Sequence, residues 1–202
     1  MKIKIVLFDA VGVLFPANTV VGDDLAARFN LSEEELSLMW KGFYQEYVLG
    51  KLTTSEFLDT FAATYHIPRE QVTEEVFTES FLRALSPIPG MEDVLRKLND
   101  TGPTVAMLSD TAEMFAQARR TSLFSEYFDH IFLSFEIGYK KPDPRAFQAV
   151  IDYYQVKPEE IFFVDDLQVN IDAAKQLGMN GAVFNDAEAL AKKLSSSGMI
   201  KP

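Results

Sequence analysis

The stretch KIVLFDAVGVL, residues 4–14, decides the fold of this chain. Residues 4–8 form a short apolar run rich in β-branched and aromatic side chains, which is typical of a buried strand. Asp9 follows that run directly. In an open parallel sheet, ligands bind at the carboxyl ends of the strands, so Asp9 is the first candidate functional residue.

Four further apolar runs have the same character, and helical patterns separate them. The runs cover residues 104–108, 130–134, 161–164 and 182–184. Between and after these runs, helices are predicted over residues 91–99, over 114–120 behind a capping box of Asp110 and Glu113, from Pro144, over 170–177 and after Asp186. Strands that alternate with helices predict an α/β fold, a Rossmann-like parallel sheet core with helices on both faces.

Residues 16–86 interrupt this alternation, because they contain no convincing strand. A capping box at Ser32 opens a helix that we expect to continue through Tyr47. A second helix is expected after Thr53, and a third over residues 76–85. The predicted result is an inserted helical-bundle cap. The domains would be a core of residues 1–15 and 87–202 and a cap of residues 16–86.

Polar side chains gather where the predicted strands end. These ends share one edge of a parallel sheet, so residues far apart in the sequence converge there. A lysine in the loop after the third strand can reach the same edge. The candidate site residues are Asp9, Ser109, Asp110, Lys141, Asp165 and Asp166.

This set of residue types suits phosphoryl transfer. A carboxylate can attack phosphorus and form an aspartyl-phosphate. A lysine, a hydroxyl and backbone N–H groups can stabilise charge on the phosphoryl oxygens. Several carboxylates in one crevice repel each other unless a hard cation lies between them, and Mg²⁺ prefers such oxygen ligands.

The order of these motifs resembles the haloacid dehalogenase superfamily. The four motifs are residues 9–14, Ser109-Asp110, Lys141-Pro142-Asp143, and Asp165-Asp166 with Asn170. The resemblance covers essentially the whole chain, and the helical insertion resembles the superfamily's C1-type cap. Residues 40–57 are further similar to the subgroup that includes bacterial glucose-1-phosphatases and the N-terminal phosphatase domain of epoxide hydrolases.

The resemblance implies a nucleophile and a Mg²⁺ site. Asp9 would be both the nucleophile and a metal ligand. The backbone carbonyl of Val11 and the carboxylate of Asp166 would be further ligands, with Asp165 nearby or bound through water. The implied function is Mg²⁺-dependent hydrolysis of a small phosphate monoester, with a sugar phosphate as one candidate substrate.

The resemblance also implies a phosphate-binding set. Ser109 and the N–H of Asp110 would hold the phosphoryl group. Lys141, rather than its neighbour Lys140, would neutralise the nucleophile and the phosphate, and would count as catalytic with Ser109. Asn170 would order the loop after the fourth strand.

One position departs from the pattern of the superfamily's phosphatases. They usually have an Asp two residues after the nucleophile, which protonates the leaving group, and this chain has Val11 there. General acid–base catalysis typically contributes about 10²–10⁴-fold. Either activity is low, or Asp23, Asp24 or substrate-assisted water supplies the proton, or the substrate has a good leaving group. We favour the last, as in an anomeric sugar, acyl or aryl phosphate.

Two alternative functions remain open. A metal-independent 2-haloacid dehalogenase also lacks that Asp, but the resemblance implies a cap arginine for halide, and none lies around Trp40. A non-catalytic phosphate-binding or regulatory homologue would explain Val11. A mutase is disfavoured, because it also needs an acid–base residue. For Arg119 and Arg120 the alternatives are contact with an anion and a solvated helix end, and we favour the solvated end.

Composition excludes several other classes. The formal net charge of -11 and the lack of a basic stripe argue against nucleic acid as a partner. The absence of cysteine excludes disulfides and thiol chemistry. No apolar run reaches the roughly 18 residues of a membrane span. We expect a cytoplasmic monomer or homodimer with no membrane partner and a small phosphorylated substrate.

Overall fold

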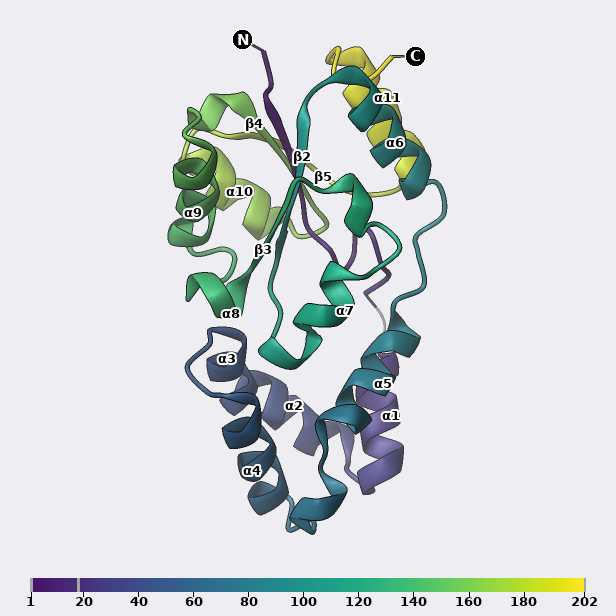
Figure 1. Cartoon of the computed structure of the whole chain (residues 1–202), viewed down its shortest axis with the longest axis vertical. Coiled ribbons are helices and arrows are strands. Elements are labelled where there is room, and N and C mark those ends of the chain that lie inside the picture. Colours follow the sequence, from purple (N-terminus) through teal and green to yellow (C-terminus); the bar gives the residue numbers. More distant parts are fainter. Residues whose placement is uncertain (1, 18, 202) are drawn as a thin grey trace.

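A parallel sheet with helices on both faces forms one part of the molecule (Figure 1). The computed structural model describes residues 2–17 and 19–201, without the side chain of Thr101. Within these residues the strand order is β3-β2-β1-β4-β5, and every neighbouring pair is parallel. The predicted fold class is therefore confirmed. The strands are β1 (Ile5–Phe8), β2 (Thr104–Ser109), β3 (His130–Leu133), β4 (Ile161–Asp165) and β5 (Asn180–Val183).

The two faces of the sheet bury different side chains of the same strands. In β1, Val6 and Phe8 join a cluster with α6 (Met91–Thr101) and α11 (Ala187–Ser196). Ile5 and Leu7 join a second cluster with α9 (Pro144–Tyr154) and α10 (Gln168–Gln176). Because both faces are covered, β1 is apolar at every position rather than alternating with polar residues.

The segment after β2 differs from its prediction. The capping box of Asp110 and Glu113 is wrong, because both carboxylates bind elsewhere. Asp110 accepts the backbone N–H of Lys141, and Glu113 accepts the N–H and hydroxyl of Thr54. Instead of one helix over 114–120, the chain forms η2 (Glu113–Phe115) and then α7 (Ala116–Arg120). Short elements η3 (Ser125–Tyr127), α8 (Ser134–Ile137) and η4 (Pro158–Glu160) complete this part.

The second part of the molecule is helical and lies below the sheet in Figure 1. Both capping boxes, at Ser32 and Thr53, are present. The single helix predicted through Tyr47 is wrong: Gly42, with φ -98° and ψ -122°, divides it into two. A first helix was not predicted at all. The helices are α1 (Val20–Phe29), α2 (Glu33–Lys41), α3 (Phe43–Val48), α4 (Thr54–Thr64), η1 (Arg69–Gln71) and α5 (Glu74–Ala84).

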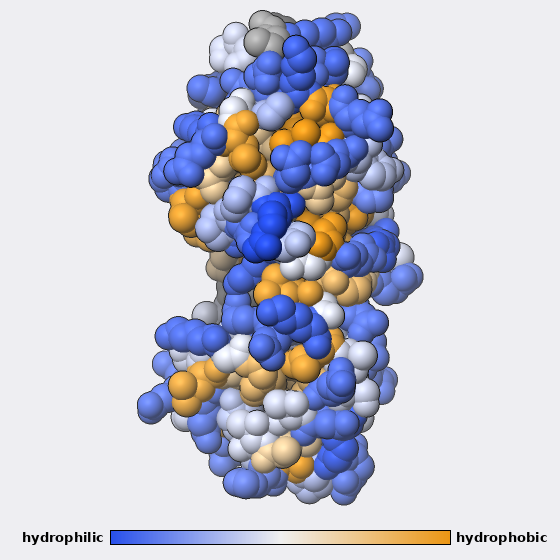
Figure 2. All heavy atoms as spheres, turned by 90° about the vertical axis from the view of Figure 1, so that its left-hand side faces the viewer, coloured by the Kyte–Doolittle hydropathy of each residue, from blue (hydrophilic) through white to orange (hydrophobic). Residues whose placement is uncertain are grey.

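The helical part is fastened to the loop that follows β2. Met114 and Phe115 belong to the same apolar cluster as the helices of the insertion. The Ser134 hydroxyl donates to the Val48 carbonyl at 2.7 Å and accepts the N–H of Thr111 at 2.9 Å. Figure 2 shows a waist between the two parts on the side of α3 and α8. The exact division into core and cap stays a prediction.

Across the described residues, none of the helices combines the length and the apolar character that crossing a membrane requires.

Candidate active site

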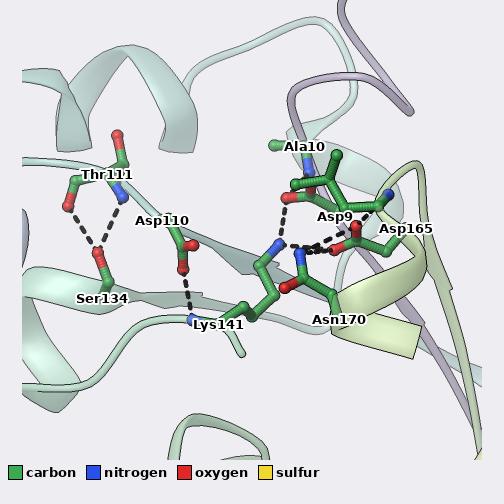
Figure 3. Close-up of polar contacts among 9 residues, drawn as sticks. Asp9, Ala10, Asp110, Thr111, Ser134, Lys141, Asp165 and Asn170 are labelled. Carbon is green, nitrogen blue, oxygen red and sulfur yellow. Dashed lines mark hydrogen bonds and ion pairs between the residues drawn. The ribbon is translucent and has the colours of Figure 1, made fainter. Parts of the chain in front are cut away.

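A buried lysine lies between two carboxylates at the carboxyl edge of the sheet (Figure 3). The Lys141 Nζ atom is 2.5 Å from Oδ1 of Asp9 and 3.1 Å from Oδ2 of Asp165. Asp9 follows β1, Asp165 ends β4, and these strands are neighbours in the sheet. The parallel topology thus brings together residues that are separated by more than a hundred positions in the sequence.

Asp165 and Asp166 have different environments although they are adjacent. The carboxylate of Asp165 is fully buried and accepts from the Asn170 amide at 3.0 Å, from the N–H of Leu167 at 2.8 Å and from Lys141. The Asp166 carboxylate accepts only from its own backbone N–H, with no hydrogen bond or ion pair to another described residue. Asp165 therefore anchors the loop, and Asp166 has oxygens available for a ligand. Asn170 thus binds the carboxylate that begins this loop, and its ordering role stays a prediction.

The three carboxylates of Asp9, Asp165 and Asp166 can hold a divalent cation. One oxygen of each lies within 4.8 Å of the others. The Asp166 carboxylate packs against Gly12, where an added Cβ would lie 2.3 Å from its Cγ atom. Gly12 also has φ +89°, so a side chain there would be strained as well as blocked.

The donor atoms left over at this cluster fit Mg²⁺. Oδ1 of Asp9 is occupied by Lys141 and by the N–H of Ala10 at 2.6 Å, which leaves Oδ2. No backbone hydrogen bond to the Val11 carbonyl occurs among the described residues. Two carboxylate oxygens and one carbonyl, completed by water and phosphate, form the kind of oxygen set that Mg²⁺ takes.

Burial and mutual repulsion shift the pKa values of these groups. Burial raises the pKa of Asp9 to about 6, although Lys141 opposes the shift. Burial and the charge of Asp165 raise the pKa of Asp166. Burial alone would lower the pKa of Lys141, but the charges of Asp9, Asp110 and Asp165 raise it overall. Lys141 is therefore a permanent cation, and the carboxylates favour a neutralising partner.

The loop after β2 carries Ser109 and Asp110, for which the sequence predicts phosphate binding. Ser109 ends β2 and is buried, and no hydrogen bond of its hydroxyl to another described residue is found. The Asp110 carboxylate accepts the N–H of Lys141 at 3.1 Å, which fixes one loop against the other. Burial raises the pKa of Asp110. Ser109 and Lys141 thus border the same edge as Asp9.

None of the sequence's candidate proton donors joins the acidic cluster. The carboxylate of Asp24 pairs with Arg83 at 2.5 Å, and that of Asp23 accepts from Thr19. Val11 is 40% exposed and carries no titratable group. The described residues therefore offer no carboxylic acid at the position where the superfamily's phosphatases have one.

The interpretation of Arg119 as a solvated residue is wrong. Its side chain is 1% exposed, whereas Arg120 is on the surface and pairs with Glu136 at 2.6 Å. Arg119 lies four residues after buried Phe115, and this helical spacing was the available signal for burial. A helix of five residues gives only a weak apolar pattern, and a charged side chain at its end is typical of a solvated position.

Comparisons with known proteins identify the family of this chain and its relatives. The model of the haloacid dehalogenase-like hydrolase family matches residues 3–178. A D-ribitol-5-phosphate phosphatase of Bacteroides thetaiotaomicron is 29% identical over 188 residues, which cover 87% of this chain and 89% of that protein. The (S)-2-haloacid dehalogenase 4A of Burkholderia cepacia is 27% identical over 195 residues, which cover 91% of this chain and 84% of that protein.

Solved structures include a relative with ligands bound. A haloacid dehalogenase family enzyme of Bacteroides thetaiotaomicron, in complex with magnesium and inorganic phosphate, matches with a TM-score of 0.75 and 25% identity. The match covers 92% of this chain and 96% of that one. Phosphatases and dehalogenases thus both occur among the relatives, so the site must decide between them.

Proposed function

The chain belongs to the haloacid dehalogenase-like hydrolase family, and within it we propose that this protein is a Mg²⁺-dependent phosphatase. The substrate would be a small phosphate monoester. The observation that carries the proposal is the cluster of Asp9, Asp165 and Asp166, whose oxygens lie within 4.8 Å of one another. Attack on carbon by a dehalogenase needs no such cation site.

In the proposed reaction each of these residues would have a separate role. Asp9 attacks phosphorus, the bond between phosphorus and the leaving-group oxygen breaks, and the resulting aspartyl-phosphate is hydrolysed by water to free Asp9 and inorganic phosphate. Lys141 neutralises charge on the nucleophile and the phosphate, and Ser109 with the N–H of Asp110 binds the phosphoryl oxygens. Mg²⁺, held by Asp9, Asp166 and the Val11 carbonyl, would supply charge stabilisation and orientation.

The test is release of inorganic phosphate from a panel of monoesters with Mg²⁺ and with EDTA. The panel contains aryl, acyl, anomeric sugar and simple alkyl phosphates. We expect turnover only with Mg²⁺, and faster for better leaving groups. Halide release from 2-haloacids in EDTA, without phosphate release, would establish the dehalogenase instead. Phosphate or Mg²⁺ binding without any turnover would indicate the non-catalytic homologue.

Val11→Asp is expected to change the ranking of substrates in that panel. The new carboxyl would lie two residues after the nucleophile and could protonate an alkoxide. We expect alkyl phosphates to react about 10²-fold faster, at the low end of general acid catalysis, with little change for aryl phosphates. Val11→Asn has the same shape without a titratable proton and is the control. Equal rates for the two variants would show that proton donation does not limit this enzyme.

A further inference from the structure

Arg119 is a buried cation that the proposed reaction does not use. Its Nε and Nη1 atoms are fully buried and have no hydrogen-bond partner among the described residues. The side chain also makes no ion pair with any described carboxylate. Most buried polar groups in proteins are hydrogen-bonded, because an unsatisfied one loses the interaction it had with water. Two such atoms on one guanidinium indicate a missing partner.

Aromatic rings hold the guanidinium in place between the two parts of the molecule. Its Cζ atom lies 5.5 Å from the ring centroid of Phe15, near the nucleophile's loop, and 4.8 Å from that of Phe81 in α5. Phe81 is itself stacked on Phe115, with centroids 4.3 Å apart. These contacts orient the side chain but leave its Nε and Nη1 atoms without an acceptor. The result is a rigid donor at the seam between α7 and the cap helices.

The guanidinium lies beside the loop that carries the nucleophile, because the Phe15 that it contacts donates its N–H to the carbonyl of Ala10, the residue after Asp9. Burial lowers the pKa of Arg119 to about 10, and the charged group that most opposes this shift is Asp9, followed by Tyr44. The pKa of Tyr44 is raised by burial, and Arg119 and Asp110 are among the charges that act on it. No hydrogen bond of the Tyr44 hydroxyl to a described residue is found. Arg119, next to the nucleophile's loop, and Tyr44, which interacts electrostatically with it, thus both have donors without an acceptor among the described residues.

The charges around this place select the ligand. Lys141 is paired with Asp9 and Asp165, and the Nζ atom of Lys140 contacts the Gln45 amide oxygen. Arg119 therefore adds one positive charge, without an ion-pair partner among the described residues, beside the nucleophile's loop. A carboxylate carries one negative charge and matches the planar donors of a guanidinium. A second phosphate would bring about two negative charges to the same place.

We propose that Arg119 and Tyr44 bind a carboxylate on the leaving group of the substrate, so that the enzyme acts on phosphorylated carboxylic acids. This inference rests on the proposed phosphatase function and narrows its substrate class. Arg119 is then a specificity-determining residue, since it binds a part of the substrate that does not react. The anchored leaving group is also oriented for attack without a carboxylic acid at Val11.

The test compares non-hydrolysable probes that differ in one carboxylate. Phosphonoacetate and 3-phosphonopropionate are titrated calorimetrically in Mg²⁺ against ethylphosphonate. The native protein should bind at least one carboxylated probe about 10- to 100-fold more tightly, as expected for hydrogen bonds to a charged group. Arg119→Met should abolish this preference and leave ethylphosphonate binding unchanged. Tyr44→Phe should reduce it by about 2- to 10-fold.

Controls separate the subsite from the proposed function and from a structural role. Arg120→Met removes the neighbouring surface arginine and should leave every affinity unchanged. If the native protein binds all probes equally, the carboxylate subsite is overturned while the proposed phosphatase function stands. Water would then be the partner of Arg119. Absence of all phosphonate binding would overturn the phosphatase together with the subsite. The melting temperature of Arg119→Met should equal or exceed the native value, and a clear fall would identify a structural arginine instead.

Discussion

Asp9→Asn is expected to lower kcat for phosphate release by about 10⁴-fold or more, because the amide cannot form the aspartyl-phosphate. The substitution keeps the shape of the side chain. Its oxygen can still lie beside Lys141 and accept the N–H of Ala10. Initial rates in saturating Mg²⁺ with the best substrate of the panel provide the measurement. A loss below about tenfold would mean that another group attacks phosphorus.

The same variant should fold at least as well as the native protein. The pKa of Asp9 is raised to about 6 from an ordinary 3.8, so its charged form is disfavoured in the folded chain. A neutral amide removes that cost, although Lys141 then keeps only Asp165 as a direct partner. Urea unfolding without metal compares the two proteins. A strong loss of stability would attribute the lost activity to misfolding rather than to chemistry.

The core of the fold was predictable because its signals are local. The strands β1 to β4 are largely apolar runs that end at or just before a polar residue. Pro144 and Asp186 mark helix starts that the structure contains. The insertion was harder to predict. Gly42 breaks a helix whose apolar spacing continues across it, and periodicity alone does not register such a break.

The site was predictable as a set of residues but not as a set of contacts. Strand ends that share one edge bring Asp9 and Asp165 together, which follows from topology. The different environments of Asp165 and Asp166 depend on the Asn170 amide and the Leu167 N–H, which only the folded loop reveals. The burial of Arg119 likewise depends on Phe81, which is 38 positions away along the chain.

Lys141→Met is expected to destabilise the metal-free protein by about 3–5 kcal/mol at neutral pH. The lysine is buried between Asp9 and Asp165, and its removal leaves two carboxylates without their shared cation. Urea unfolding in EDTA measures the loss. Lys140→Met is the matched control, because that ammonium contacts the neutral amide of Gln45 and should contribute less than about 1 kcal/mol.

The loss should depend on pH in a defined direction. Without Lys141, the folded-state pKa of Asp9 must rise above its native value of about 6, while the unfolded value stays near 3.8. A carboxyl whose pKa is higher in the folded state than in the unfolded state binds protons more tightly when folded. Asp9 stays protonated in both folded proteins below about pH 6, so the stability of the variant relative to native should fall as pH rises above about 6. A penalty independent of pH would point to lost packing of the lysine stem instead.

Mg²⁺ should recover part of this loss, and more in the variant than in the native chain. Removal of a competing cation makes the cluster of Asp9, Asp165 and Asp166 more negative, so a divalent ion binds it more tightly. Binding at 100 times Kd stabilises a folded protein by about 2.7 kcal/mol. Unfolding curves at increasing Mg²⁺ concentration would show the gap between the two proteins closing. If the gap stays constant, the three carboxylates do not form the cation site, and the metal-dependent chemistry proposed for Asp9 loses its support.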